Sequence, residues 1–102
     1  MSARGPTVTL KPAARRDFRS ILAYTSAQWG VTQRDIYRAA IDRAFETLGA
    51  NPEIGKARDE LSPGLRSYQV EQHVIYYRVS SSGVRIVRIL HGRMDAARHL
   101  DE

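Results

Sequence analysis

The chain has 102 residues, of which 42% are hydrophobic and 26% are charged. This length and composition predict one globular domain and exclude an intrinsically disordered chain. Sixteen Lys and Arg against eleven Asp and Glu give a net charge of +5, which favours an acidic partner such as nucleic acid or an acidic protein segment.

Cysteine is absent, so disulfides and thiolate metal sites are excluded. The three histidines lack the spacing of a metal site, and nothing in the sequence calls for a cofactor. No apolar run approaches the roughly 18 residues that would span a bilayer. Met1 to Pro6 also lacks the apolar core of a signal peptide. We therefore expect a cytoplasmic protein without a membrane partner.

Residues 1–6 are predicted to be a flexible tail, and residues 7–100 a single domain. The alternating polar and apolar residues from Thr7 to Lys11 predict a short strand. A helix can begin at Pro12, because proline is tolerated in the first turn. Its apolar stripe extends to Trp29, and we expect Phe18 and Trp29 in the core. Gly30 fits just past the helix end.

A second helix is predicted to start with Thr32 as its N-cap and Asp35 as a variant of the capping box. Its apolar stripe extends from Ile36 to Leu48, and Gly49, Asn51 and Pro52 end it. A connection of about two residues between the helices predicts an antiparallel hairpin. Tyr24 and Tyr37 are expected at the edge of the core, with their hydroxyls in water.

Residues 51–64 are predicted to form a loop, because they hold two prolines and two glycines without a clear period. Three strands follow, at Leu65–Glu71, His73–Val79 and Val84–Leu90, with a tight turn near Gln72 and a second turn at 80–83. His73 is expected to be a turn residue without a role.

Side chains alternate between the two faces of a strand. In the last strand this predicts Val84, Ile86, Arg88 and Leu90 on one face of the sheet. The helix hairpin should cover one face, and the other should mix apolar residues with arginines. Such a face could receive a partner, or it could be an ordinary sheet surface with snorkelling arginines.

The chain carries several short signatures in a fixed order. They are Ala14-x-x-Asp17-Phe18-x-x-Ile21-x-x-Tyr24, Gly30, Pro52-x-x-Gly55, Leu65-Arg66, Ile75-x-Tyr77-Arg78-Val79 and Ile89-Leu90-His91-Gly92-Arg93-Met94-Asp95. Together they resemble the RelE/ParE superfamily of toxins from bacterial type II toxin–antitoxin systems. The last signature is more similar to the ParE branch than to the RelE branch.

The resemblance implies a small α+β domain, in which a strand and a helix hairpin precede a three-stranded antiparallel meander and the helices pack on one face of the sheet. It implies a growth inhibitor that is neutralised by a cognate, ParD-like antitoxin with an acidic C-terminal segment. The expected target is DNA gyrase, poisoned by binding rather than by an enzymatic reaction. DNA would be contacted only indirectly, through the antitoxin.

The alternative is a RelE-like, ribosome-dependent mRNA endoribonuclease. Cleavage through the 2′-hydroxyl needs an acid, a base and cations on the phosphate. The resemblance would assign these roles to Arg66, Arg93 and His99. The lysine-rich character of a RelE site is missing, however, since Lys56 is the only lysine near these residues. Arg93 or an earlier arginine could instead pair with Asp95 and fix the turn.

In the binding interpretation no residue is catalytic, and the arginines make bidentate contacts with carboxylates of the partner. The candidate antitoxin- or target-binding residues are Arg66, Tyr76, Arg78, Arg88, His91, Arg93 and Arg98. A third class, a stand-alone nucleic-acid-binding domain, has only the charge in its favour. The chain has no helix-turn-helix pattern, no RNP-like aromatics and no glycine-rich phosphate loop.

Overall fold

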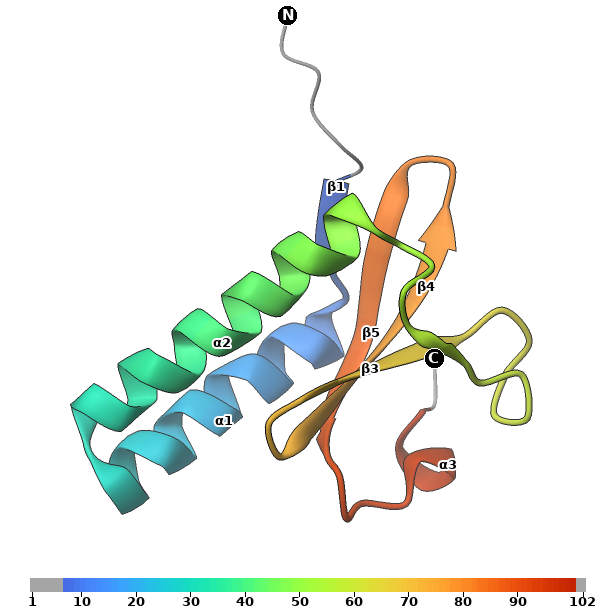
Figure 1. Cartoon of the computed structure of the whole chain (residues 1–102). Helices are drawn as coiled ribbons and strands as arrows, with labels where there is room; N and C mark the ends of the chain where they lie inside the picture. Colours follow the sequence, from blue (N-terminus) through green and yellow to red (C-terminus); the bar gives the residue numbers. More distant parts are fainter. Residues whose placement is uncertain (1–6, 101–102) are drawn as a thin grey trace, which may run out of the picture.

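A computed structural model describes residues 7–100, and the predicted tail at residues 1–6 lies outside the described residues. The domain is α+β, as predicted (Figure 1). Its elements in chain order are β1 (Thr7–Leu10), α1 (Pro12–Trp29), α2 (Val31–Ala50), β2 (Lys56–Ala57), β3 (Arg66–Val70), β4 (His73–Ser80), β5 (Gly83–His91) and α3 (Ala96–His99).

Gly30 alone connects α1 and α2. Its φ of 93° lies in the left-handed region that favours glycine, and its N–H bonds to the carbonyl of Ser26 at 2.9 Å. The predicted cap at Thr32 is wrong. Gly30 is the N-cap of α2, no side chain makes a capping hydrogen bond, and Thr32 already lies inside the first turn.

The sheet has five strands in the order β1-β5-β4-β3-β2. The β3–β4–β5 meander is antiparallel, as predicted, while β1 lies parallel to β5 and makes the sheet mixed. The 51–64 segment is not entirely loop, because Lys56 and Ala57 pair with Ser67 and Arg66 as the short edge strand β2. The helix hairpin lies across one face of the sheet (Figure 1).

The predicted alternation along β5 holds through Val87 and is wrong beyond it, because a β-bulge interrupts it. Tyr77 pairs with Ile86 but its neighbour Tyr76 pairs with Arg88, so Val87 is the extra residue. Val84, Ile86 and Ile89 therefore face the helices, whereas Val87 and Leu90 face the other side.

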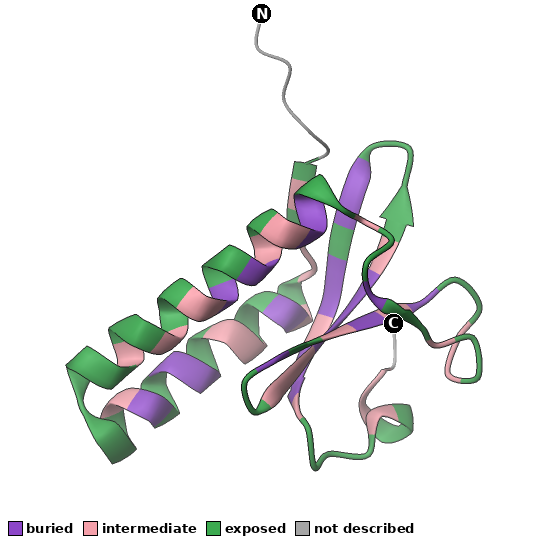
Figure 2. Ribbon diagram, in the orientation of Figure 1, coloured by how far each residue is buried: buried purple, intermediate pink, exposed green. Residues whose placement is uncertain are grey.

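Two clusters of buried residues lie on the two faces of the sheet (Figure 2). The main core between sheet and helices contains Tyr77 and Ile41, and Phe18 packs against it. Trp29 was expected there but is 71% exposed, because it is the last residue of α1, beyond the end of the sheet face. The second cluster contains Leu65, Tyr76, Val87 and Leu90.

Candidate partner-binding surfaces

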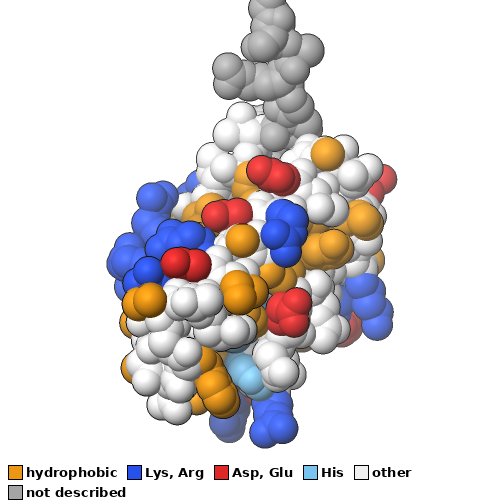
Figure 3. All heavy atoms as spheres, turned by 60° about the vertical axis from the view of Figure 1, so that its left-hand side comes forward, with side chains coloured by type: hydrophobic (Ala, Val, Ile, Leu, Met, Phe, Trp, Pro, Cys, Tyr) orange, Lys and Arg blue, Asp and Glu red, His pale blue; other side chains and the backbone are white. Residues whose placement is uncertain are grey.

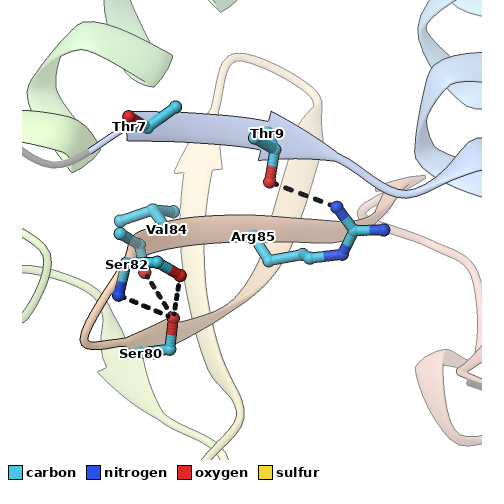
Figure 4. A pocket seen from close by; sticks show the side chains of 7 residues that line it. Thr7, Thr9, Ser80, Ser82, Val84 and Arg85 are labelled. Carbon is cyan, nitrogen blue, oxygen red and sulfur yellow. Dashed lines mark hydrogen bonds between the residues drawn. The ribbon is translucent and has the colours of Figure 1, made fainter.

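The sheet face away from the α1–α2 hairpin, here called the helix-free face although the short helix α3 packs at its edge, carries two arginines in cross-strand register. Arg78 of β4 and Arg85 of β5 are register partners on this face. Arg78 donates hydrogen bonds to the carbonyl of Pro63 (2.7 Å) and to the hydroxyl of Ser62. Exposed Arg85 donates to Thr9 Oγ1 at 3.2 Å, at a shallow depression rich in hydroxyl groups (Figure 4).

Tyr76 lies on the same face but is only 6% exposed. The guanidinium of Arg58 sits over its ring, 5.9 Å from the ring centre, and also contacts Glu60 at 2.7 Å. Leu61, Ala96 and Leu100 pack on the same cluster, so the chain's own loop and C-terminal segment cover part of this face. Tyr76 is thus partly shielded by its own chain.

The C-terminal turn follows β5 and presents exposed cations. Arg93 is exposed, and its N–H bonds to Nδ1 of half-buried His91 at 3.1 Å. Asp95 does not pair with Arg93. It caps α3 by accepting from the N–H of Ala97 at 3.2 Å, and it lies 3.9 Å from the highly exposed Arg98. An exposed pair at that distance adds little stability, so Arg93 and Arg98 can both reach a partner.

Arg66 and Tyr77 together hold the 52–55 segment. The Arg66 guanidinium donates to the carbonyls of Gly55 (2.7 Å) and Glu53 (3.2 Å). The Tyr77 hydroxyl donates to the carbonyl of Pro52 (2.8 Å) and accepts from the N–H of Gly55 (2.9 Å). A Cβ at Gly55 would lie 2.4 Å from that hydroxyl, so no other residue fits there without a shift.

Arg88 is also engaged within the chain. Its guanidinium contacts Asp17 of α1 at 2.7 Å, and both side chains are largely buried. The predicted binding arginines therefore form two sets. Arg66, Arg78 and Arg88 hold the fold together, while Arg93 and Arg98 are exposed.

Sequence reasoning missed a groove between the tip of the helix hairpin and the end of the sheet, of about 520 Å³. Tyr37, His73 and His91 are among the residues that line it. The Tyr37 hydroxyl hydrogen-bonds His73 Nδ1, and the His73 and His91 rings meet edge-to-face with 5.3 Å between centres. Burial, with His91 nearby, lowers the pKa of His73. His73 is thus a strand residue with partners. Its pairing with His91 depends on the β-bulge, because the unshifted register of the 80–83 turn would place His73 opposite Leu90.

Within residues 7–100, no helix is long and apolar enough to cross a membrane, and no group of three or more acidic or histidine side chains is arranged to hold a metal ion.

The family of this chain follows from sequence comparison. A family model described as "ParE toxin of type II toxin-antitoxin system, parDE" matches residues 8–96. The chain belongs to the ParE toxin family. Its ParE relatives include Toxin ParE1 of Mycobacterium tuberculosis, 40% identical over 92 residues that cover 89% of this chain and 94% of that protein. Toxin ParE1 of Caulobacter vibrioides is 33% identical over 91 residues, covering 89% and 94% of the two chains.

Solved structures agree with the ParE assignment at the level of the fold. The chromosomal ParDE TA system from P. aeruginosa contains a chain with a TM-score of 0.73 and 19% identity, covering 84% of this chain and 95% of that one. The toxin–antitoxin complex RelBE2 from Mycobacterium tuberculosis gives a TM-score of 0.61 with 27% identity, covering 86% and 99%.

For a ParE-family chain, the placement of the ribonuclease candidates is informative. Arg66 is the register partner of Tyr77, so its side chain lies on the helix-covered face. His99 belongs to α3, whose neighbours Ala96 and Leu100 pack on the helix-free face. No described contact joins either residue to Arg93. The structure does not bring the three candidates into one site.

Proposed function

We propose that this protein is a growth inhibitor that acts in the cytoplasm by binding and poisoning DNA gyrase, and that a cognate ParD-like antitoxin neutralises it. Membership of the ParE family supports the toxin role. DNA would be reached only through the antitoxin. No cofactor takes part in this action.

Arg66 lies on the helix-covered face of the sheet, whereas the α3 segment that contains His99 packs on the other face. This observation supports inhibition by binding rather than by RNA cleavage. A general acid or base must lie within hydrogen-bond reach of the group it serves, and the phosphate ligands must surround the same phosphate. The Arg66 guanidinium is already engaged with two backbone carbonyls. The RelE-like alternative, favoured by the likeness to RelBE2, needs a rearrangement of this loop.

For the antitoxin we propose an acidic segment that crosses the helix-free face. The exposed guanidinium of Arg85 supports this placement, because it lies on this face and a carboxylate of the antitoxin would accept its hydrogen bonds. The exposed Arg93 and Arg98 extend the same positive charge to the C-terminal turn.

The target is tested by incubating the purified protein with DNA gyrase and relaxed plasmid, and separately with translating ribosomes and mRNA. Poisoning predicts loss of supercoiling and accumulation of cleaved plasmid, with intact mRNA. Ribosome-dependent cuts that disappear in Arg93→Ala and His99→Ala would instead establish the endoribonuclease.

The antitoxin surface is tested with Arg85→Glu. Both Arg85 and Arg43 are exposed, and Arg43 lies on α2 on the other side of the molecule, so Arg43→Glu is the matched control. We expect the affinity for the antitoxin to fall at least tenfold in Arg85→Glu and to stay within threefold in Arg43→Glu. Equal losses would mean that net charge, not this face, governs binding.

A further inference from the structure

Four large hydrophobic side chains are exposed around the tip of the helix hairpin. Tyr24 is 65%, Trp29 71%, Val31 57% and Ile36 55% exposed. Together they present on the order of 500 Å² of mostly apolar surface. This area is within the range of about 300–600 Å² for the largest apolar patch of a typical monomer, and such a patch is often functional. Figure 3 shows hydrophobic side chains beside a histidine at the lower end of the helix-hairpin side.

Part of this apolar surface is one wall of the groove described above. Tyr24, Trp29 and Ile36 line the groove from the hairpin, and Glu71, Gln72 and His73 line it from the end of the sheet. The wall on the sheet side is well fixed, because the Tyr37 hydroxyl binds both His73 Nδ1 and the N–H of Gln72. The result is a mostly apolar groove that also contains polar groups from Glu71, Gln72 and His73, and such a groove can accept an amphipathic helix.

The charge of the groove differs from that of the rest of the protein. Glu71 is the one charged residue among the residues that line it, and neither lysine nor arginine is among them. Nearby Arg34 is paired with Asp35 at 3.0 Å. An acidic helix would therefore be repelled by Glu71 and would find no lysine or arginine among the residues that line the groove. A helix with an apolar face and a basic residue at its edge is complementary.

We propose that this groove binds an amphipathic helix of the toxin's cellular target, with apolar residues against Trp29 and Ile36 and a Lys or Arg opposite Glu71. The inference rests on the proposed toxin function, but it does not depend on which target is correct. It assigns target and antitoxin to two surfaces of opposite character. The acidic antitoxin segment belongs to the arginines of the helix-free face.

A second copy of this chain is a poor occupant of the groove. A two-fold dimer would place the same patch against itself, so two grooves would face each other and their Glu71 carboxylates would approach. The exposed apolar area is also smaller than the roughly 800 Å² per partner of a standard interface.

The test is the double variant Trp29→Ala/Ile36→Ala. Its matched control is Ile54→Ala/Val79→Ala, which removes two other exposed hydrophobic side chains, at 51% and 39% exposure, outside this groove. We expect the first variant to lose growth arrest on induction and to bind purified gyrase at least tenfold more weakly, while its affinity for the antitoxin changes less than threefold. The control should behave as wild type in all three measurements.

Glu71→Lys, which leaves the apolar surface intact, provides an independent variant and should also weaken target binding. Trp29 is the only tryptophan, so 5-fluorotryptophan gives a single ¹⁹F signal that should shift with gyrase and not with antitoxin. Full growth arrest by the Trp29→Ala/Ile36→Ala variant, or an equal loss of antitoxin affinity, overturns the proposal. Wild-type growth arrest without gyrase binding would refute the proposed target alone, and the growth comparison would still test the groove.

Discussion

The guanidinium of Arg88 in β5 donates two hydrogen bonds to the carboxylate of Asp17 in α1, from Nε to Oδ2 at 2.7 Å and from Nη2 to Oδ1 at 2.9 Å. Asp17 Oδ2 also accepts the N–H of Ile89 at 2.9 Å, and Arg88 donates a further bond to the carbonyl of His99. The reason lies in the topology. β1 ends at Leu10, which pairs with Ile86, and the edge of β5 beyond that point needs another acceptor. Asp17 supplies it, and Arg88, which bonds to both Asp17 and the His99 carbonyl, ties α1, β5 and α3 together.

Asp17→Ala should therefore lower the free energy of unfolding by about 2–4 kcal/mol, because it leaves the largely buried Arg88 guanidinium and the Ile89 N–H without their acceptor. Urea denaturation measures the change. Arg43→Ala, an exposed arginine on α2, should stay within about 0.5 kcal/mol.

The double-mutant cycle of Asp17→Ala with Arg88→Ala should give a coupling of at least about 1 kcal/mol. Strictly additive effects would mean that the two side chains do not stabilise the fold as a pair.

Tyr77→Phe should lower the free energy of unfolding by about 1–3 kcal/mol, since it leaves the Pro52 carbonyl and the Gly55 N–H without their partner. The ring itself is fully buried and unchanged in shape. Hydrogen exchange should report faster opening of the 52–55 segment. Tyr24→Phe, which removes a hydroxyl from a side chain that is 65% exposed, is the control. Equal stability of Tyr77→Phe and wild type would show that the hydroxyl does not hold the loop.

The lowered pKa of His73 predicts how the free energy of unfolding depends on pH. Burial, then the neighbouring His91, lower its pKa below the ordinary 6.5, while Asp17 acts in the opposite sense. Below pH 6.5 the unfolded chain thus binds more protons than the folded one, and stability falls as the pH decreases toward the folded pKa. Protonation of His73 would also remove the acceptor at Nδ1 that faces Tyr37.

Unfolding titrations in urea between pH 5 and 8 should therefore show a loss of stability on acidification that is smaller in His73→Gln. Comparison of the two proteins separates His73 from the carboxylates that titrate at lower pH. An identical pH profile for the variant would assign the acid sensitivity to other groups.

The order of elements was predictable because it depends on local patterns. The apolar stripe of α1, the glycine at position 30 and the turn at 80–83 are each determined within a few residues, and the structure confirms all three. The family signatures also acquire a physical meaning. Pro52, Gly55, Arg66 and Tyr77, which are distant in sequence, meet in one set of hydrogen bonds.

The roles of the arginines could not be predicted, because they depend on tertiary contacts. The bulge at Val87 shifts Arg88 relative to the simple alternation, and nothing local to β5 identifies Asp17 as its partner. Trp29 was assigned to the core from its place on the helical stripe, but α1 extends beyond the sheet. The groove was missed for the same reason, since its two walls come from segments that are 31 or more residues apart in the sequence.

The C-terminal helix α3 should open locally without global unfolding. None of its residues is buried, and Ala96 and Leu100 alone connect this segment to the second cluster over Tyr76. Elements with so few apolar contacts open at low free energy. Amides of residues 97–100 should exchange much faster than those of β5, and Leu100→Ser should speed them further while the urea midpoint changes little. Opening would break the Arg88 bond to the His99 carbonyl and expose Tyr76. Protection of α3 equal to that of β5 would show that the C-terminal segment is a fixed part of the core.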